Sequence, residues 1–225
     1  GRMSACTVVG VKGDAFQLAS ADRVDVVDST VISPVAGAEL PPDGVSLVDV
    51  TACSVVGGSI SGSPGHGVFV NDSSWVSVER VEVTDVDQEA FGIFVNDDCT
   101  DVRVSGCHVH DTHRDGIHVH RSERVVVEGN LVYRTGDDGI ATNGDVGTDA
   151  RPKDVVIANN VVFGAGARGI AVMGRSDVLV EGNLVESTYM AGIGVEVFFS
   201  VGVDPEDFGP IDAITIRGNH LVDPG

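Results

Sequence analysis

The feature that most restricts the fold of this chain is an internal repeat. A glycine followed by a β-branched residue returns at intervals of 23, 25, 24, 23, 30 and 23 residues. The repeat glycines are Gly44, Gly67, Gly92, Gly116, Gly139, Gly169 and Gly192. After each glycine come a short alternating strand, a polar turn and a second strand, as in the stretch that ends with Glu128-Gly129-Asn130. Both halves alternate like strands, which favours a β-solenoid over a leucine-rich repeat with its Leu-rich helical or 3₁₀ returns.

The repeat predicts an all-β fold, a single-stranded right-handed parallel β-helix with coils of about 23–25 residues. The right hand is expected because parallel β-crossover-β connections overwhelmingly take it. Nine residues before the next repeat glycine stands a small or polar residue, and stacked coils would align these into a ladder. The ladder positions are Gly58, Cys107, Asn130, Asn160 and Asn183.

The repeat extends over the whole chain, so we expect one β-helix domain over residues 1–225. Residues 14–18 resemble the repeat strand, and residues 214–219 begin a further coil, as if the chain were a piece of a longer solenoid. Extra length is inserted at residues 33–43, 144–153 and 201–212. In solenoids such insertions gather over the binding face.

Composition agrees with this fold and excludes some functions. The chain has 29 glycines and only 5% aromatic residues, and its apolar residues are mainly Val and Ile, which favour strands. Lys and Arg total 14 against 34 Asp and Glu, so no basic stripe is available for nucleic acid. Neither a membrane span nor a signal peptide is visible. The four cysteines lack zinc-site spacing, so we expect buried thiols.

Strand alternation predicts which side chains face outward. If Ile117 and Val119 point into the core, His118 and His120 point out. Adjacent coils lie about 4.8 Å apart, so residues just before successive repeat glycines become neighbours. The resulting outward patch, taken as the candidate substrate-binding surface, comprises His118, His120, Asn143, Arg168, Glu196, Phe69 and Phe94. The two phenylalanines are either a sugar-stacking platform or a surface covered by a further segment.

Three segments in this region resemble a known enzyme family. They are Arg114-Asp115-Gly116-Ile117-His118, Gly136-Asp137-Asp138-Gly139-Ile140-Ala141 and Ala167-Arg168-Gly169-Ile170. Over about the central third of the chain, they resemble the polygalacturonase-type glycoside hydrolases of family 28. Coils of that family read Asn-Thr-Asp-Gly-Ile-Asp, Gly-Asp-Asp-Cys-Ile-Ala and Gly-His-Gly-Ile.

The resemblance implies three catalytic acids, with Asp137 as the general acid and Asp115 and Asp138 activating water. It also implies an oligo- or polysaccharide substrate, inversion at the anomeric carbon, and an extracellular or cell-surface protein. Arg168 stands at the family's His position, and Gly194-Val195-Glu196 replaces its Arg-x-Lys. The substrate-carboxylate contact of the family is therefore not carried over.

The acid cluster is also reasonable as chemistry. Carboxyl groups within about 5 Å cannot all ionise, so one stays protonated as an acid while another acts as a base. That spacing by itself would predict retention of configuration. An Asp before Gly is also ordinary turn chemistry, so a purely structural role remains an alternative.

Two other functions fit the same sequence. A polysaccharide lyase or mannuronan C5-epimerase would use His118 or His120 as the base and Arg168 to neutralise a uronate carboxylate. A non-enzymatic adhesin, tail-fibre segment or copper-accessory protein would need none of the acids. We expect no cofactor and no metal in the site, although the acidic turn at residues 96–101 has ligand types suited to Ca²⁺.

Overall fold

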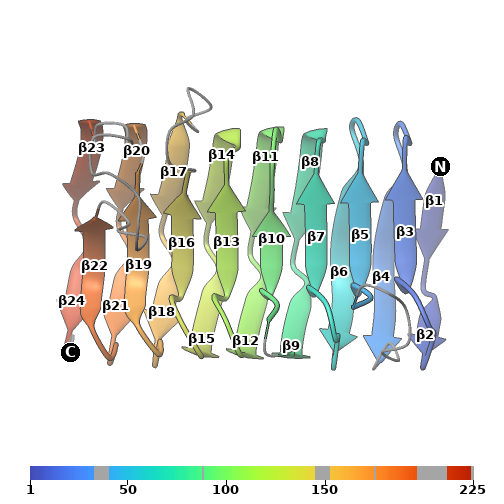
Figure 1. Cartoon of the computed structure of the whole chain (residues 1–225), viewed down its shortest axis with the longest axis horizontal. Coiled ribbons are helices and arrows are strands. Elements are labelled where there is room, and N and C mark those ends of the chain that lie inside the picture. Colours follow the sequence, from blue (N-terminus) through green and yellow to red (C-terminus); the bar gives the residue numbers. More distant parts are fainter. Residues whose placement is uncertain (33–40, 88, 145–152, 175, 197–211, 224–225) are drawn as a thin grey trace, which may run out of the picture.

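The computed structural model describes residues 1–32, 41–87, 89–144, 153–174, 176–196 and 212–223. These residues form 24 strands and no helix. The strands stack side by side into an elongated solenoid, with the N-terminus at one end and the C-terminus at the other (Figure 1). Since the described residues contain no helix, they contain none that could cross a membrane.

One face of the solenoid is an eight-stranded sheet built from the strands that follow the repeat glycines. In spatial order it contains β3 (Phe16–Ala19), β5 (Val45–Val48), β7 (Val68–Asn71), β10 (Ile93–Val95), β13 (Ile117–His120), β16 (Ile140–Asn143), β19 (Arg168–Met173) and β22 (Ala191–Glu196). Every pairing within it is parallel.

The other strands belong to a 16-stranded sheet with two parallel rows. One row contains β8 (Ser74–Glu79), β11 (Thr100–Ser105), β14 (Glu123–Glu128), β17 (Val155–Ala158), β20 (Ser176–Glu181) and β23 (Asp212–Arg217). The second contains β9 (Glu82–Val86), β12 (His108–Thr112), β15 (Leu131–Thr135), β18 (Val161–Phe163), β21 (Leu184–Glu186) and β24 (His220–Val222). The rows join at β6 (Ser54–Ser61), which pairs with both, and β4 (Asp25–Ile32) extends β6 toward β1 (Arg2–Ser4) and β2 (Thr7–Val9).

The register along the eight-stranded sheet follows the repeat. Ile117 pairs with Ile140, and Ile140 with Ile170. The predicted interior set, Ile117, Val119, Ile140, Ile170 and Val172, is fully buried. Alternation therefore places the branched side chains in the core, and this prediction is confirmed.

The repeat glycines are required by close packing at the corner where each coil enters the sheet. A Cβ atom on Gly116 would lie 2.3 Å from Cγ1 of Val132 and 2.8 Å from the carbonyl oxygen of Gly139. At Gly139 the same atom would lie 2.3 Å from Cγ1 of Val162. No side chain fits these distances, which explains why glycine recurs there.

The predicted amide ladder is present. The side-chain nitrogen of Asn130 donates to Oδ1 of Asn160, and that of Asn160 donates to Oδ1 of Asn183, both at 3.0 Å. The ladder continues to Asn219, at 2.9 Å. Each of these oxygens also accepts the backbone N–H of the preceding ladder residue. Cys107 donates its backbone N–H to Asn130 and so begins the ladder.

Two other predictions concern thiols and insertions. Cys53, Cys99 and Cys107 are buried free thiols, whereas Cys6 is only partly buried. The predicted insertions lie mostly outside the described residues; they are at residues 33–43, 144–153 and 201–212.

Candidate functional site

A pocket of about 300 Å³ opens on the outward surface of the eight-stranded sheet, along β13, β16 and β19. It brings together eight of the ten predicted site residues from several coils. They are Asp115, Asp137, Asp138, His118, His120, Asn143, Arg168 and Phe94. One carboxylate oxygen from each of the three aspartates lies within 4.8 Å of the other two.

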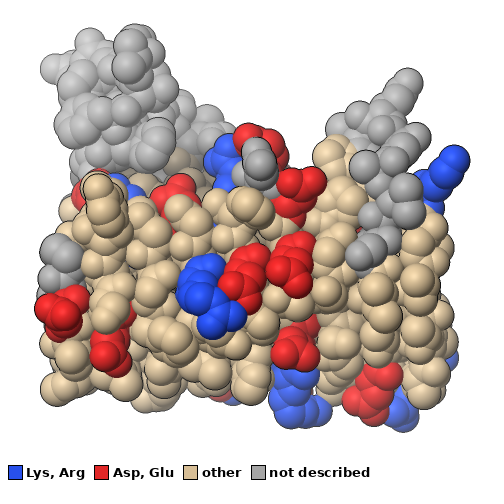
Figure 2. All heavy atoms as spheres, turned by 90° about the horizontal axis from the view of Figure 1, so that it is seen from below, with Lys and Arg blue, Asp and Glu red and all other residues tan. Residues whose placement is uncertain are grey.

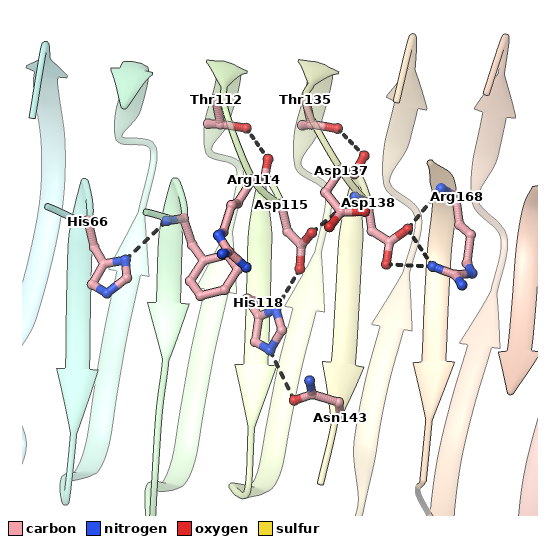
Figure 3. A network of polar contacts seen from close by, with 11 residues as sticks. His66, Thr112, Arg114, Asp115, His118, Thr135, Asp137, Asp138, Asn143 and Arg168 are labelled. Atoms are coloured by element: carbon pink, nitrogen blue, oxygen red, sulfur yellow. Dashed lines mark hydrogen bonds and ion pairs between the residues drawn. The ribbon is translucent and has the colours of Figure 1, made fainter. Parts of the chain in front are cut away.

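Asp115 is held on both of its carboxylate oxygens (Figure 3). Oδ2 lies 2.5 Å from Nδ1 of His118, and Oδ1 accepts the backbone N–H of Asp138 at 3.0 Å. The other ring nitrogen of His118 lies 3.0 Å from Oδ1 of Asn143. These contacts fix the imidazole between a carboxylate and an amide.

Asp138 occupies the equivalent position one coil further along. Its Oδ1 accepts the backbone N–H of Arg168 at 2.8 Å, and the guanidinium of Arg168 contacts both oxygens, at 3.3 and 3.4 Å. Burial and the negative charge of Asp115 raise the pKa of Asp138 to about 6, although Arg168 opposes the rise. Asp138 is therefore fixed by the chain and still accepts a proton readily.

Asp137 is the least constrained of the three acids. Its backbone carbonyl accepts a hydrogen bond from the Thr135 hydroxyl at 3.0 Å, which holds the turn. Within the described part of the chain, its carboxylate accepts no hydrogen bond. Partial burial and the charge of Asp115 raise its pKa. An open carboxyl group with a raised pKa beside two fixed carboxylates suits proton donation.

Arg168 and Glu196 close the C-terminal side of the pocket. The guanidinium donates from Nε to Oε1 of Glu196 at 2.7 Å and from Nη2 to Oε2 at 2.8 Å. This bidentate ion pair raises the pKa of Arg168 and lowers that of Glu196. With Asp138 on its other side, Arg168 faces two carboxylates.

The outward residues are less exposed than alternation predicts. His118 is 6% exposed, so its predicted exposure was wrong: it lies against Phe91, with ring centroids 4.4 Å apart. His120 and Asn143 are half-buried, and only Glu196 is exposed as expected. A side chain on the outer face can thus be covered by its neighbours on adjacent coils.

Aromatic rings extend from the pocket toward the N-terminus. Phe69 stacks on His66 at 5.3 Å between centroids, and Phe91 lies parallel to His66 at 5.5 Å. Phe94 contacts Phe91 at 4.7 Å and Phe69 at 5.7 Å. We call these four residues the aromatic shelf. Phe69 itself lines a neighbouring pocket of about 380 Å³ rather than the one with the acids.

Sequence reasoning missed three residues of this region. Phe91 and His66 occupy the column before the repeat glycines that also holds Asp115, and that shared position was the available signal. Arg114 lines the acid pocket and pairs with Glu89. The sequence shows that Arg114 directly precedes Asp115, but not that its side chain lines the pocket.

Two groups of carboxylates have ligand types suited to a cation. The Asp115, Asp137 and Asp138 oxygens are close enough to share one ion. In the acidic turn, Asp97 lies 3.0 Å from Nδ1 of His120, and Asp101 accepts two hydrogen bonds from Arg124. These pairings occupy carboxylates that the suggested Ca²⁺ site would need.

The stacked parallel coils define a parallel β-helix, a class of repeat protein in which each coil contacts mainly its neighbours. The family model described as the right handed beta helix region matches residues 43–203. The chain therefore belongs to the right-handed β-helix family, and the expected hand is confirmed. Comparison with curated protein sequences gives no match.

Solved structures with this fold include carbohydrate-active enzymes and adhesins. The catalytic unit of a GH87 α-1,3-glucanase from Streptomyces thermodiastaticus is 22% identical, with a TM-score of 0.60 over 100% of this chain and 41% of the glucanase chain. The mannuronan C-5 epimerase AlgE6 A-module from Azotobacter vinelandii is 12% identical, with a TM-score of 0.62 over 91% of this chain and 59% of the epimerase chain. PfbA, a surface adhesin of Streptococcus pneumoniae, is 11% identical, with a TM-score of 0.65 over 97% of this chain and 59% of the adhesin chain.

These similarities establish the fold alone, because the identities are low. The chain spans between 41% and 59% of the length of these structures.

Proposed function

We propose that the protein is a glycoside hydrolase that acts on an extended saccharide, with Asp137 as the general acid and Asp115 and Asp138 as the groups that activate water. One observation carries this proposal: the open Asp137 carboxyl has a raised pKa and lies beside two carboxylates that the chain holds in place. The resemblance to family 28 hydrolases supports the same roles. A GH87 α-1,3-glucanase in complex with tetrasaccharides, 17% identical to this chain, has a similar fold.

In the proposed reaction, Asp137 gives its proton to the glycosidic oxygen as the bond from that oxygen to the anomeric carbon breaks. Water forms the new bond to the anomeric carbon and passes a proton to Asp115 or Asp138. A separation of about 5 Å between the carboxyl groups generally indicates retention, whereas the family resemblance implies inversion. We favour inversion, because both groups accept backbone N–H bonds and suit holding a water better than direct attack.

The geometry favours hydrolysis over the lyase or epimerase chemistry. A lyase would need Arg168 to neutralise a uronate carboxylate, and Arg168 already faces Glu196 and Asp138. Of the two candidate bases, His118 is nearly buried between Asp115 and Asn143. His120 is half-buried, and its Nδ1 already contacts Asn96 and Asp97. A polymeric saccharide substrate also implies work outside the cell or at its surface.

The test is product analysis on a panel of polysaccharides. We expect release of reducing ends without unsaturated sugars, and proton NMR of early products should reveal the inverted anomer. Asp137→Asn should lower the release by about 10²- to 10⁴-fold. Unsaturated products would establish a lyase instead. Full activity in Asp137→Asn would show that Asp137 is not the general acid. If no polysaccharide in the panel is turned over, the hydrolase is contradicted and a non-enzymatic binding protein is favoured.

A further inference from the structure

The cations of the acid pocket are already paired. Arg168 is bound through two hydrogen bonds to Glu196 and also faces Asp138. Arg114, the other arginine that lines the pocket, pairs with Glu89 and lies over the Phe91 ring, 5.9 Å from its centroid.

A polyuronate would bring a carboxylate with every sugar into this region. It would meet Asp115, Asp137 and Asp138, and beside them Glu196, which is paired with Arg168. Both described arginines of the pocket are already paired with carboxylates. Like charges at such separations repel, and burial strengthens the effect. The pocket therefore disfavours acidic saccharides. Figure 2 shows one long face of the molecule, where basic side chains stand singly or beside acidic ones and form no continuous stripe.

The aromatic shelf, in contrast to the acid pocket, is an uncharged and largely apolar surface. Its rings come from adjacent coils and are all partly exposed, and Phe91 joins the shelf to His118 of the acid pocket. Burial and the nearby His118 lower the pKa of His66 to about 4, so the shelf carries no charge at neutral pH. Flat aromatic faces bind the apolar C–H faces of sugar rings, which gain from leaving water.

The aromatic shelf runs along the row of coils, parallel to the solenoid axis. Hollows of about 300 and 380 Å³ flank it along the row of coils, the first lined by the acids and the second by His66 and Phe69. Coils repeat every 4.8 Å or so. This rise is close to the advance of one sugar ring in an extended chain, so successive rings would meet successive coils.

We infer that the substrate is an uncharged polysaccharide, whose chain lies along the solenoid axis across the aromatic shelf and reaches the acids from their N-terminal side. This inference rests on the proposed function, because it assigns the substrate of that same site. The cluster of carboxylates and the paired arginines disfavour acidic sugars, and the shelf supplies affinity without charge.

Binding to the inactive Asp137→Asn protein tests the inference. Affinity electrophoresis would compare uncharged α-glucans, β-glucans, mannan and xylan with polygalacturonate and alginate. We expect an uncharged polymer to bind best, and Phe69→Ala and Phe94→Ala each to weaken binding about 10-fold, the loss of roughly one stacking contact. Phe163→Ala is the matched control, because Phe163 stacks on Tyr133 in the other sheet, away from the shelf.

The outcomes separate the inference from the proposed function. Preferred binding of a polyuronate, no binding of any uncharged polymer, or equal losses in Phe69→Ala and Phe163→Ala would overturn the inference. If the wild-type protein hydrolyses a polyuronate, the hydrolase stands and the inference falls. If Asp137→Asn binds an uncharged polymer through Phe69 while the wild-type protein releases no sugar from it, the inference stands and the hydrolase falls.

Discussion

Oδ1 of Asp138 accepts the backbone N–H of Arg168, which occupies the same position one coil later, at 2.8 Å. Asp115 makes the same contact with Asp138, and Asp43 makes it with His66. The aspartate before a repeat glycine thus links one coil to the next, whatever else it does. Asp137 lies outside this column, so catalysis and coil linkage can be separated by substitution.

Asp137→Asn should lower turnover by about 10²- to 10⁴-fold, the usual contribution of a general acid. Its melting temperature should stay the same or rise slightly, because one of three crowded carboxylates loses its charge. Turnover and melting temperature are measured on the same preparation. Asp85→Asn, an exposed substitution on β9, is the control and should change neither. Lost stability with unchanged turnover per folded molecule would instead assign Asp137 a structural role.

The pH dependence of activity should respond to Arg168. Its positive charge lowers the pKa values of both Asp137 and Asp138. Removing that charge in Arg168→Gln should raise both pKa values. The general acid then stays protonated to higher pH, and the alkaline limb of the kcat/KM profile shifts to higher pH. A full pH profile of both proteins checks this. An unmoved limb would mean that these carboxyls do not control the rate.

Asp43 should make the protein less stable as pH rises. Burial raises its pKa to about 7, far above its value in the unfolded chain. The folded state therefore binds the proton more tightly between about pH 4 and pH 7, and the free energy of unfolding falls as pH rises through that window. Asp43→Asn cannot ionise and still offers an oxygen to the His66 N–H. We expect it to be more stable than the wild type at pH 8 by about 1–3 kcal/mol and equal to it near pH 4. Urea unfolding at both pH values measures the difference, and an equal gain at both would exclude the charge as the cause.

Asn160→Ala should destabilise the solenoid by about 2–4 kcal/mol, because the buried N–H of Asn130 loses its acceptor and the carbonyl of Val127 loses the hydrogen bond from the Asn160 side chain. Chemical denaturation gives the value. The neighbouring Asn159→Gly is the control, since Asn159 is exposed and has φ 54°, which glycine adopts without strain. Similar losses in both variants would argue against the ladder as a source of stability.

The sequence by itself determined the architecture. Period-two alternation assigned Ile117 and Val119 to the core, and the spacing of the glycines set the register that pairs Ile117 with Ile140. The Asn130 ladder followed from the same spacing. These features could be predicted because they depend on local geometry that is copied from coil to coil.

Only the tertiary structure decided which outward side chains contact one another. Alternation placed His118 and Arg168 on the outer face, but not the Phe91 ring that covers His118 or the Glu196 carboxylate that pairs with Arg168. Alternation also did not reveal that the Asp137 carboxylate is open, whereas that of Asp138 is bound to the next coil. The physical reason is that coils about 4.8 Å apart bring side chains from different repeats into direct contact. The exposure, charge and freedom of each outward group therefore depend on neighbours more than twenty residues away in the sequence.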